Sequence, residues 1–406
     1  MSTATAGGAR VERAGAAPAR PLRVLHVITR MIVGGAQENT MLSCALIDRS
    51  RFASTLLTGP ETGVEGSLHD ESTARGVRLT IEPSLVRRLS PWHDLVATIR
   101  LTRSMRRERF DIVHTHSSKA GIVGRIAAWL AGVPVIVHTV HGWGFNRHQP
   151  PHIYWLYVWL ERFCARLSPV LIVVGTPNRD EGLALGIGRP EQYRLIRSGI
   201  EIETYRDVAL TRDAARARIP VPRDAFVVGS IGRLGEQKSP LDLFRAFVRL
   251  AASRPEAHLV FVGDGPQRGE LESAIREAGL ADRVHLTGLR RDVPELLRAF
   301  DVFALASRWE GLPRVFPQAM AAGLPIVATS VDGAPDAVIP GETGWLVEVG
   351  DIEGMADRLT ALAADPDGAR RMGAAGRARV EEFSARRMVD QLAATYVEMA
   401  GKRGIR

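Results

Sequence analysis

Cysteine and long apolar runs are scarce in this sequence, and each scarcity excludes a class of protein. Only two of the 406 residues are cysteines, Cys44 and Cys164, and both lie in apolar segments. A disulfide scaffold is therefore excluded, and we expect two buried free thiols in a reducing compartment. The strongest apolar run, 153–160, is ended by Glu161 and Arg162 and is far shorter than the roughly 20 residues that cross a bilayer.

The N-terminus lacks the apolar core of a secretory signal. Residues 1–20 are rich in Ala, Gly and Arg, which predicts a disordered tail. Together these absences predict a soluble cytoplasmic protein that would touch a membrane only from the inside.

An excess of positive charge is present but modest. The chain has 53 Lys and Arg against 45 Asp and Glu, a formal net charge of +8. This balance favours anionic partners, namely phosphates, anionic lipids or nucleic acid. Because the charge is spread and lacks an interleaved aromatic strip, we expect no nucleic-acid partner.

Short apolar runs alternate with helical patterns along most of the chain, which is typical of parallel sheets covered by helices. The predicted strands are 24–28, 112–116, 135–140, 171–174, 226–231, 258–262, 284–286, 302–306 and 326–329. The predicted helices include 36–48, 91–107, 241–252, 295–300 and 385–399, with a core helix over most of 153–163. The length exceeds one ordinary core, so we expect an α/β protein of two doubly wound domains.

A polar stretch with two prolines interrupts this rhythm between Ser198 and Asp224. We therefore predict, after the tail, an N-terminal domain at 21–205, a linker at 206–222, a C-terminal domain at 223–384 and a final helical segment at 385–406. The final segment is predicted to pack back toward the N-terminal domain.

Glycine turns follow several predicted strands, and open parallel sheets bind ligands at the carboxyl ends of their strands. Gly34 and Gly35 open a helix, where backbone amides can approach an anion or simply form a tight turn. After the strand 226–231, a glycine loop carries Arg233 and Lys238 into a helix. Two cations beside free amides suit a diphosphate, although a solvated loop would carry the same residues.

Two further glycine turns are weaker signals. Gly263, Asp264 and Gly265 follow one strand, and Gly288 and Leu289 follow the next. Backbone groups in the second loop could read the edge of a base, or the loop could be an ordinary connection.

The densest motif follows the strand 302–306. Glu310 stands before Gly311 and a helix that starts near Val315, and its carboxylate can hold hydroxyls by charge-assisted hydrogen bonds. Gln318 lies eight positions further on. A carboxylate near a helix N-terminus is also common for structural reasons alone.

In their order and spacing these motifs resemble glycosyltransferase family 4, which has the GT-B architecture of two Rossmann-like domains facing each other across a cleft. The resemblance covers nearly all of 22–399 and is more specific in the C-terminal half. It is carried by Gly34-Gly35, Gly232-Arg233 with Lys238, Gly263-Asp264-Gly265-Pro266, Glu310-Gly311-Leu312-Pro313, 319–325, and Gly341 with Gly344.

The resemblance implies an enzyme that moves a hexose or N-acetylhexosamine from a nucleotide sugar, expected to be a UDP-sugar, with retention of configuration. The nucleotide sugar is a substrate, and no cofactor or obligatory metal is expected. Arg233 and Lys238 would stabilise the leaving diphosphate, Glu310 would hold sugar hydroxyls, and His141 would contact the donor sugar or the acceptor. The residues implied in donor binding are Gly34, Gly35, Gly232, Gly263, Asp264, Gly265, Gly288, Leu289, Gly311, Leu312, Pro313 and Gln318.

The chain departs from the family at Gln318, where most members have a second glutamate that grips the ribose. An amide still accepts a hydrogen bond, so ribose binding can survive. Asp365-Pro366-Asp367 spells the metal-binding D-x-D pattern of other glycosyltransferases, but it follows a helical stretch and is interpreted as a helix-boundary turn.

The segment 114–121 is similar to relatives that build cell-surface polysaccharide on lipid-diphosphate carriers, and we expect a polyprenyl-diphosphate-linked acceptor. Ser117, Ser118 and Lys119 would cap a helix N-terminus as an anion site, and Trp143 lies in a loop suited to contact the acceptor. Seven arginines between residues 87 and 109 would contact the anionic inner face of the membrane, or would form a solvated helix face.

Three alternatives stay open at this point. A sugar-nucleotide epimerase on the same scaffold would need acid and base carboxylates at the sugar, and only Glu310 is well placed. The chain could also bind nucleotide sugars without catalysis. The acceptor could be a soluble small molecule such as a natural-product aglycone.

Overall fold

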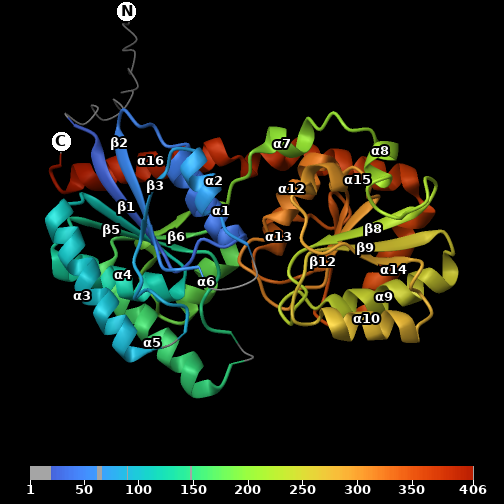
Figure 1. The fold of residues 1–406 in the computed structure, drawn as a ribbon, viewed down its shortest axis with the longest axis horizontal. Coiled ribbons are helices and arrows are strands. Elements are labelled where there is room, and N and C mark those ends of the chain that lie inside the picture. The colour runs from blue at the N-terminus through green and yellow to red at the C-terminus, as the bar shows by residue number, and fades with distance from the viewer. Residues whose placement is uncertain (1–19, 62–65, 89, 147–148, 406) are drawn as a thin grey trace, which may run out of the picture.

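The computed structural model describes residues 20–61, 66–88, 90–146 and 149–405. Except for Arg20, the predicted disordered tail lies outside the described residues. The described chain forms two lobes side by side, each built on one parallel sheet with helices on both faces (Figure 1). The fold class predicted from the sequence is therefore confirmed.

The first lobe holds a seven-stranded sheet in the order β3-β2-β1-β4-β5-β6-β7. Its strands are β1 Leu22–Ile28, β2 Phe52–Thr58, β3 Arg78–Ile81, β4 Ile112–His116, β5 Val135–Val140, β6 Val170–Val173 and β7 Tyr193–Leu195. Its helices are α1 Gly35–Ala45, α2 His69–Ala74, α3 Pro91–Glu108, α4 Ser118–Ala131, α5 Pro151–Leu167 and α6 Thr176–Ala184, with a 3₁₀ turn at Pro190–Gln192.

The second lobe holds a six-stranded sheet in the order β10-β9-β8-β11-β12-β13. Its strands are β8 Phe226–Ile231, β9 Ala257–Val262, β10 Val284–Leu286, β11 Val302–Leu305, β12 Ile326–Thr329 and β13 Gly344–Val347. Its helices are α9 Pro240–Ser253, α10 Arg268–Glu277, α11 Val293–Leu297, α12 Val315–Ala322, α13 Ala334–Ala337, α14 Ile352–Ala364 and α15 Pro366–Arg379. The short helices α7 Ile202–Arg206 and α8 Arg212–Arg216 lie between the sheets in the chain, and a 3₁₀ turn at Val380–Phe383 precedes α16 Ala385–Lys402.

The central strands are buried on both faces, which explains why they are nearly continuous apolar runs in the sequence. All nine predicted strands are present. The strands β2, β3, β7 and β13 were not predicted. β3, β7 and β13 are edge strands of three or four residues, whereas β2 has seven residues and lies inside the sheet. Short edge strands carry too few alternating residues to stand out from loops.

The last helix, α16, crosses back to the first sheet (Figure 1). Met388, Leu392, Tyr396 and Met399 form its buried face against residues of β1, β4, β5 and β6. Spacings of three and four residues place them on one side of the helix. The end of the chain therefore contributes to the core of the N-terminal sheet.

Two smaller predictions can be checked directly. Cys44 and Cys164 are free and buried, as expected. Among the described residues, no helix is both long enough and apolar enough to cross a bilayer.

The sequence predicted that the aromatic residues of 153–163 lie on a core helix, and for two of them the predicted burial is wrong. The helix exists as α5, but Trp155 and Trp159 on it are 55% and 62% exposed. An apolar stripe that faces outward has the same periodicity as one that faces inward, so the pattern alone could not distinguish the two.

Candidate active site

The turns that follow β8, β9 and β10 pack into one layer at the carboxyl end of the second sheet. The amide of Gly263 donates to the carbonyl of Gly288 (2.8 Å), and the amide of Leu234 donates to the carbonyl of Asp264 (3.0 Å). Gly263 has φ = 139°, and a Cβ there would lie 2.1 Å from the carbonyl oxygen of Gly232. Glycine is therefore required at Gly263 by both conformation and space.

Lys238 and Glu310 form an ion pair beside this layer. The Nζ of Lys238 lies 2.5 Å from Oε1 of Glu310, and the hydroxyl of Ser307 donates to the same oxygen at 2.7 Å. The two side chains are 20% and 8% exposed. Arg233 lies on the same loop as Lys238 with an exposed side chain. The structure thus brings together the cation and the carboxylate that the sequence placed 72 positions apart.

Asp332 is a member of this site that the sequence did not indicate. Its carboxylate accepts a hydrogen bond from the amide of Glu310 at 2.5 Å. Burial, with the nearby charge of Glu310, raises the pKa of Asp332 to about 6. Its φ of 41° is left-handed, which Asp tolerates better than most residues. An Asp-Gly pair after a strand is typical of a turn and by itself gives no indication of a site.

The two lobes touch at the backbone next to Glu310. A Cβ on Gly311 would lie 1.8 Å from the carbonyl oxygen of His141, and a Cβ on Gly142 would lie 3.4 Å from the amide of Gly311. The carbonyl of Gly311 also accepts from the amide of Gly333 (2.8 Å). His141 of the first lobe therefore lies directly beside the Glu310-Gly311 motif of the second.

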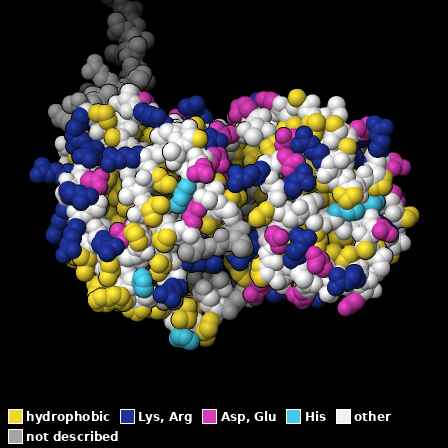
Figure 2. Space-filling view, viewed as in Figure 1, with side chains coloured by type: hydrophobic (Ala, Val, Ile, Leu, Met, Phe, Trp, Pro, Cys, Tyr) yellow, Lys and Arg dark blue, Asp and Glu magenta, His cyan; other side chains and the backbone are white. Residues whose placement is uncertain are grey.

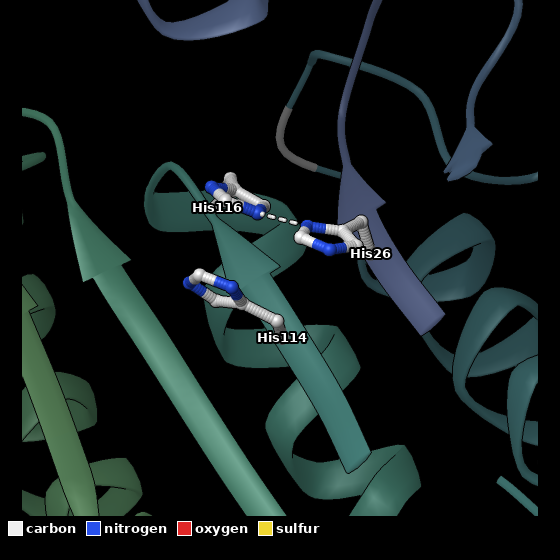
Figure 3. Close-up of side chains that lie close together, drawn as sticks. All are labelled: His26, His114 and His116. Atoms are coloured by element: carbon white, nitrogen blue, oxygen red, sulfur yellow. Dashed lines mark hydrogen bonds between the residues drawn. The ribbon is translucent and has the colours of Figure 1, made fainter. Parts of the chain in front are cut away.

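A row of buried histidines leads from the first sheet to His141. Nδ1 of His26 lies 3.0 Å from Nε2 of His116, and Nδ1 of His116 lies 3.1 Å from Nε2 of His141. Figure 3 shows His26 and His116 facing each other across β1 and β4, with His114 beside them. Burial lowers the pKa values of His26 and His141 to about 3, so both imidazoles are neutral at physiological pH.

His26, His114 and His116 are the one group in the described part of the chain whose spacing would suit a metal ion. Both nitrogens of His114 already have partners, the hydroxyls of Tyr396 (2.5 Å) and Thr139 (2.7 Å). His114 therefore stands outside the hydrogen-bonded row and has no nitrogen left to ligate an ion. The D-x-D pattern is a helix boundary, as predicted, because Asp365 accepts from the amide of Gly368 and caps α15.

Arg314 joins the lobes at a second point and was not identified from the sequence. Its guanidinium donates to the carboxylate of Glu38 on α1 (2.6 Å) and to the carbonyl of Gly199 (3.0 Å). A Cβ on Gly35 would lie 3.4 Å from its Cδ. Gly34 is the N-cap residue of α1. The predicted Gly34-Gly35 turn thus lies at the contact between the lobes.

The remaining donor-side residues occupy varied environments. Leu312, Pro313 and Gln318 are buried around the start of α12, whereas Leu289 is 59% exposed. The amide of Gln318 donates to the hydroxyl of Tyr205 (2.9 Å). That contact uses the nitrogen and leaves its oxygen to accept, which is the property that ribose binding would need.

The predicted acceptor residues cluster at the N-terminus of α4. Ser117 is the N-cap residue of α4, but its side chain makes no capping hydrogen bond. Ser118 lies so close to Gly144 that a Cβ on Gly144 would be 2.0 Å from the Oγ of Ser118. Lys119 forms an ion pair with Asp94 on α3 (2.7 Å). The indole of Trp143 donates to the carbonyl of Asn178 (2.9 Å). The polar groups of Lys119 and Trp143 are therefore engaged within the first lobe.

Comparison with known proteins matches both halves of the chain. Residues 34–199 match the family "Glycosyl transferase 4-like domain", and residues 211–379 match "Glycosyl transferases group 1". A relative from Escherichia coli, UDP-Gal:alpha-D-GlcNAc-diphosphoundecaprenol alpha-1,3-galactosyltransferase, is 32% identical over 85% of this chain and 88% of its own. The capsular polysaccharide biosynthesis glycosyltransferase CapM of Staphylococcus aureus is 25% identical over 76% of this chain and 82% of its own.

Among solved structures, Anabaena HepE in complex with UDP and glucose superposes with a TM-score of 0.80 at 23% identity, over 93% of this chain and all of that one. This likeness supports the fold of two facing Rossmann-like lobes. The two family models match most of both lobes, and the 32% identical relative matches 85% of the chain. The chain belongs to family 4 of the glycosyltransferases and has the GT-B fold.

Proposed function

We propose that this glycosyltransferase moves a sugar, a hexose or N-acetylhexosamine, from a UDP-sugar to a hydroxyl of a polyprenyl-diphosphate-linked saccharide, with retention of configuration. The observation that carries the proposal is the Lys238–Glu310 ion pair beside the glycine turns of the second lobe. The E. coli relative, named for UDP-Gal and for a diphosphoundecaprenol-linked acceptor, supports both the base and the acceptor class.

Lys238 and Arg233 would receive the diphosphate of the donor. As the bond between the anomeric carbon and the phosphate oxygen breaks, negative charge grows on the leaving group, and fixed cations stabilise it most at that stage. A diphosphate would compete with Glu310 for Lys238. Its binding would free the carboxylate of Glu310 to accept hydrogen bonds from the donor sugar.

The acceptor hydroxyl would attack the same face of the anomeric carbon that the phosphate leaves. Its proton would pass to the departing phosphate oxygen, so the reaction needs no protein base. His141, with its pKa lowered to about 3, would act as a neutral hydrogen-bonding partner at this point rather than as a cation. The reaction would take place at the inner face of the cell membrane, where a lipid-linked acceptor is anchored.

The test is a transfer assay with UDP-, GDP- and dTDP-sugars and a short-chain polyprenyl-diphosphate sugar. We expect a UDP-sugar to be consumed in step with product formation, and we expect the product to keep the donor's anomeric configuration by NMR. Because the proposal uses no metal, a chelator should leave the rate unchanged.

Each alternative outcome contradicts a defined part of the proposal. An epimer formed without acceptor would indicate an epimerase, and donor binding without turnover would indicate a non-catalytic protein. Transfer only to soluble aglycones would exclude the lipid-linked acceptor, and an inverted product would exclude retention.

A further inference from the structure

Large apolar side chains are exposed along three neighbouring helices of the first lobe. Of fifteen exposed large hydrophobic residues in the described chain, nine lie on α3, α4 and α5. We call these nine the aromatic face: Trp92, Leu95, Ile99, Trp129, Leu130, Trp155, Leu156, Trp159 and Phe163. Figure 2 shows apolar side chains gathered over α3 and α5 at the lower left of the molecule, with basic side chains beside them.

The aromatic face is separate from the core that holds these helices in place. On α3, the residues Ala97, Leu101 and Met105 pack inward, while Trp92 and Leu95 point to the other side. The spacings of three and four residues on α3 and α5 form a continuous outward stripe on each helix. An apolar surface of this kind on a helix that already has a buried side indicates a binding surface.

The charge around the aromatic face is predominantly positive. The three helices carry eight Lys and Arg against three Asp and Glu. Two of the acids are neutralised locally, because Glu161 pairs with the buried Arg125 (2.6 Å) and Asp94 pairs with Lys119 (2.7 Å). The basic side chains that reach solvent are Arg100, Arg103, Arg106, Arg107, Arg162 and Arg166.

Exposed tryptophans flanked by arginines match the interface of an anionic bilayer. Indole rings are stable at the level of the lipid headgroups, and arginines are attracted to anionic lipids. A second copy of this chain is a poorer partner, because the same arginines would face each other across the contact.

We propose that the aromatic face docks the protein on an anionic membrane surface. This inference rests on the proposed function, because docking would bring the enzyme to an acceptor that is anchored in the membrane. The Lys119–Asp94 ion pair joins the N-terminus of α4 to α3, so the aromatic face adjoins the residues Ser117 and Ser118 predicted to meet the acceptor. Docking would therefore hold that part of the lobe at the lipid surface.

The experiment measures co-sedimentation of the full chain with vesicles, without any sugar nucleotide. Wild type should bind vesicles of phosphatidylcholine with phosphatidylglycerol, bind pure phosphatidylcholine weakly, and lose affinity as salt is raised. The double variant Trp155→Ser/Trp159→Ser should bind about tenfold more weakly. Arg103→Gln/Arg107→Gln should lose about fivefold per cation at low salt, and this loss should shrink at high salt.

Two matched variants of the second lobe serve as controls. Val248→Ser/Val349→Ser removes exposed apolar groups, and Arg370→Gln/Arg371→Gln removes two exposed charges from α15. Both should bind vesicles like wild type. Equal urea midpoints for all four variants would show that the effects are not caused by misfolding.

The proposal is overturned if the tryptophan variant binds like wild type, or if wild-type binding ignores lipid charge and salt. It is also overturned if wild type dimerises, the tryptophan variant is monomeric and neither binds vesicles. Vesicle binding without transfer to any lipid-linked acceptor would contradict the proposed function but would still support the docking surface. Normal transfer in detergent by a variant that fails on vesicles would support both.

Discussion

The two lobes present differently built surfaces to the site between them. In the second lobe, glycine turns bring backbone groups together and the paired Lys238 and Glu310 lie beside them. In the first lobe, the group beside Glu310 and Gly311 is His141, a neutral imidazole at the end of the histidine row, and Lys119 is paired with Asp94 on the neighbouring helix. Under the proposed function, the second lobe would stabilise the leaving group with charge, whereas the first lobe would contribute shape and hydrogen bonds.

The two paired lysines give the strongest test of this comparison. Lys238→Ala should lower kcat about 10³-fold, because a fixed charge aimed at the leaving group is lost. Lys119→Ala, which breaks a similar ion pair in the first lobe, should change kcat by less than about tenfold and should act mainly on KM for the acceptor. Steady-state kinetics decide, and an equal loss of kcat in both variants would remove the distinction between the lobes.

A substitution of Arg314 measures how much the contacts between the lobes contribute to the free energy of unfolding. Arg314→Ala leaves Glu38 and the carbonyl of Gly199 without their partner, and we expect it to lower the free energy of unfolding by about 3 kcal/mol. The control Arg249→Ala breaks an exposed pair with Glu353 and should cost about 0–1 kcal/mol. Urea denaturation measures both, and similar costs would show that the lobes do not depend on the Arg314 contacts.

The histidine row makes the first lobe sensitive to acid. The pKa of His26 is lowered to about 3 in the folded state, so between about pH 6.5 and 3 the unfolded chain binds the extra proton. Stability should fall as pH falls, by about 2 kcal/mol for His26 between pH 7 and 5.

In the His26→Gln variant, the fall in unfolding free energy between pH 7 and 5 should be about 2 kcal/mol smaller than in wild type. This comparison does not depend on how much the substitution itself destabilises the protein at pH 7. His152→Gln is the control, because His152 is exposed at the start of α5 and is not buried on folding. An unchanged slope in His26→Gln would contradict the assignment.

The smallest expected change in unfolding free energy is that of Asp332→Asn. The contribution of Asp332 to stability falls as pH rises, which is opposite to that of His26. The raised pKa of Asp332, about 6, means that the folded state binds the extra proton between about pH 4 and 6, and that this stabilisation is lost as pH rises through 6. Asp332→Asn removes the charge and keeps an oxygen to accept from the amide of Glu310. We expect it to stabilise the protein by about 1 kcal/mol at pH 7, after allowing for solvent screening, and to have little effect at pH 4. A variant that is less stable at both pH values would refute this.

The candidate-site residues of the second lobe could be predicted better than those of the first because they lie in short, local sequence motifs. Gly232, Arg233 and Lys238 follow one strand, and Glu310 and Gly311 follow another, so each motif could be recognised without knowing its neighbours. Parallel strands then bring their carboxyl ends to one edge of the sheet. The roles of these residues in catalysis stay predictions.

The first lobe was predicted less well because its features depend on contacts far apart in the sequence. Lys119 appeared available for an anion until the structure placed Asp94 beside it. Trp155 and Trp159 appeared to be core residues, because periodicity shows that a helix has an apolar side and not which way that side faces. Arg314 gave no signal, since Glu38 lies 276 positions away.

Three features could be predicted from the sequence alone because they depend on spacings of a few residues. They are the family, the alternation of strands and helices, and the local groups that could bind a diphosphate. By contrast, the pairing of Lys238 with Glu310, the contact of Arg314 between the lobes and the outward orientation of four tryptophans could be seen only in the folded chain. Those outcomes depend on how whole layers pack, and packing determines which charges are matched and which apolar surfaces remain for a partner.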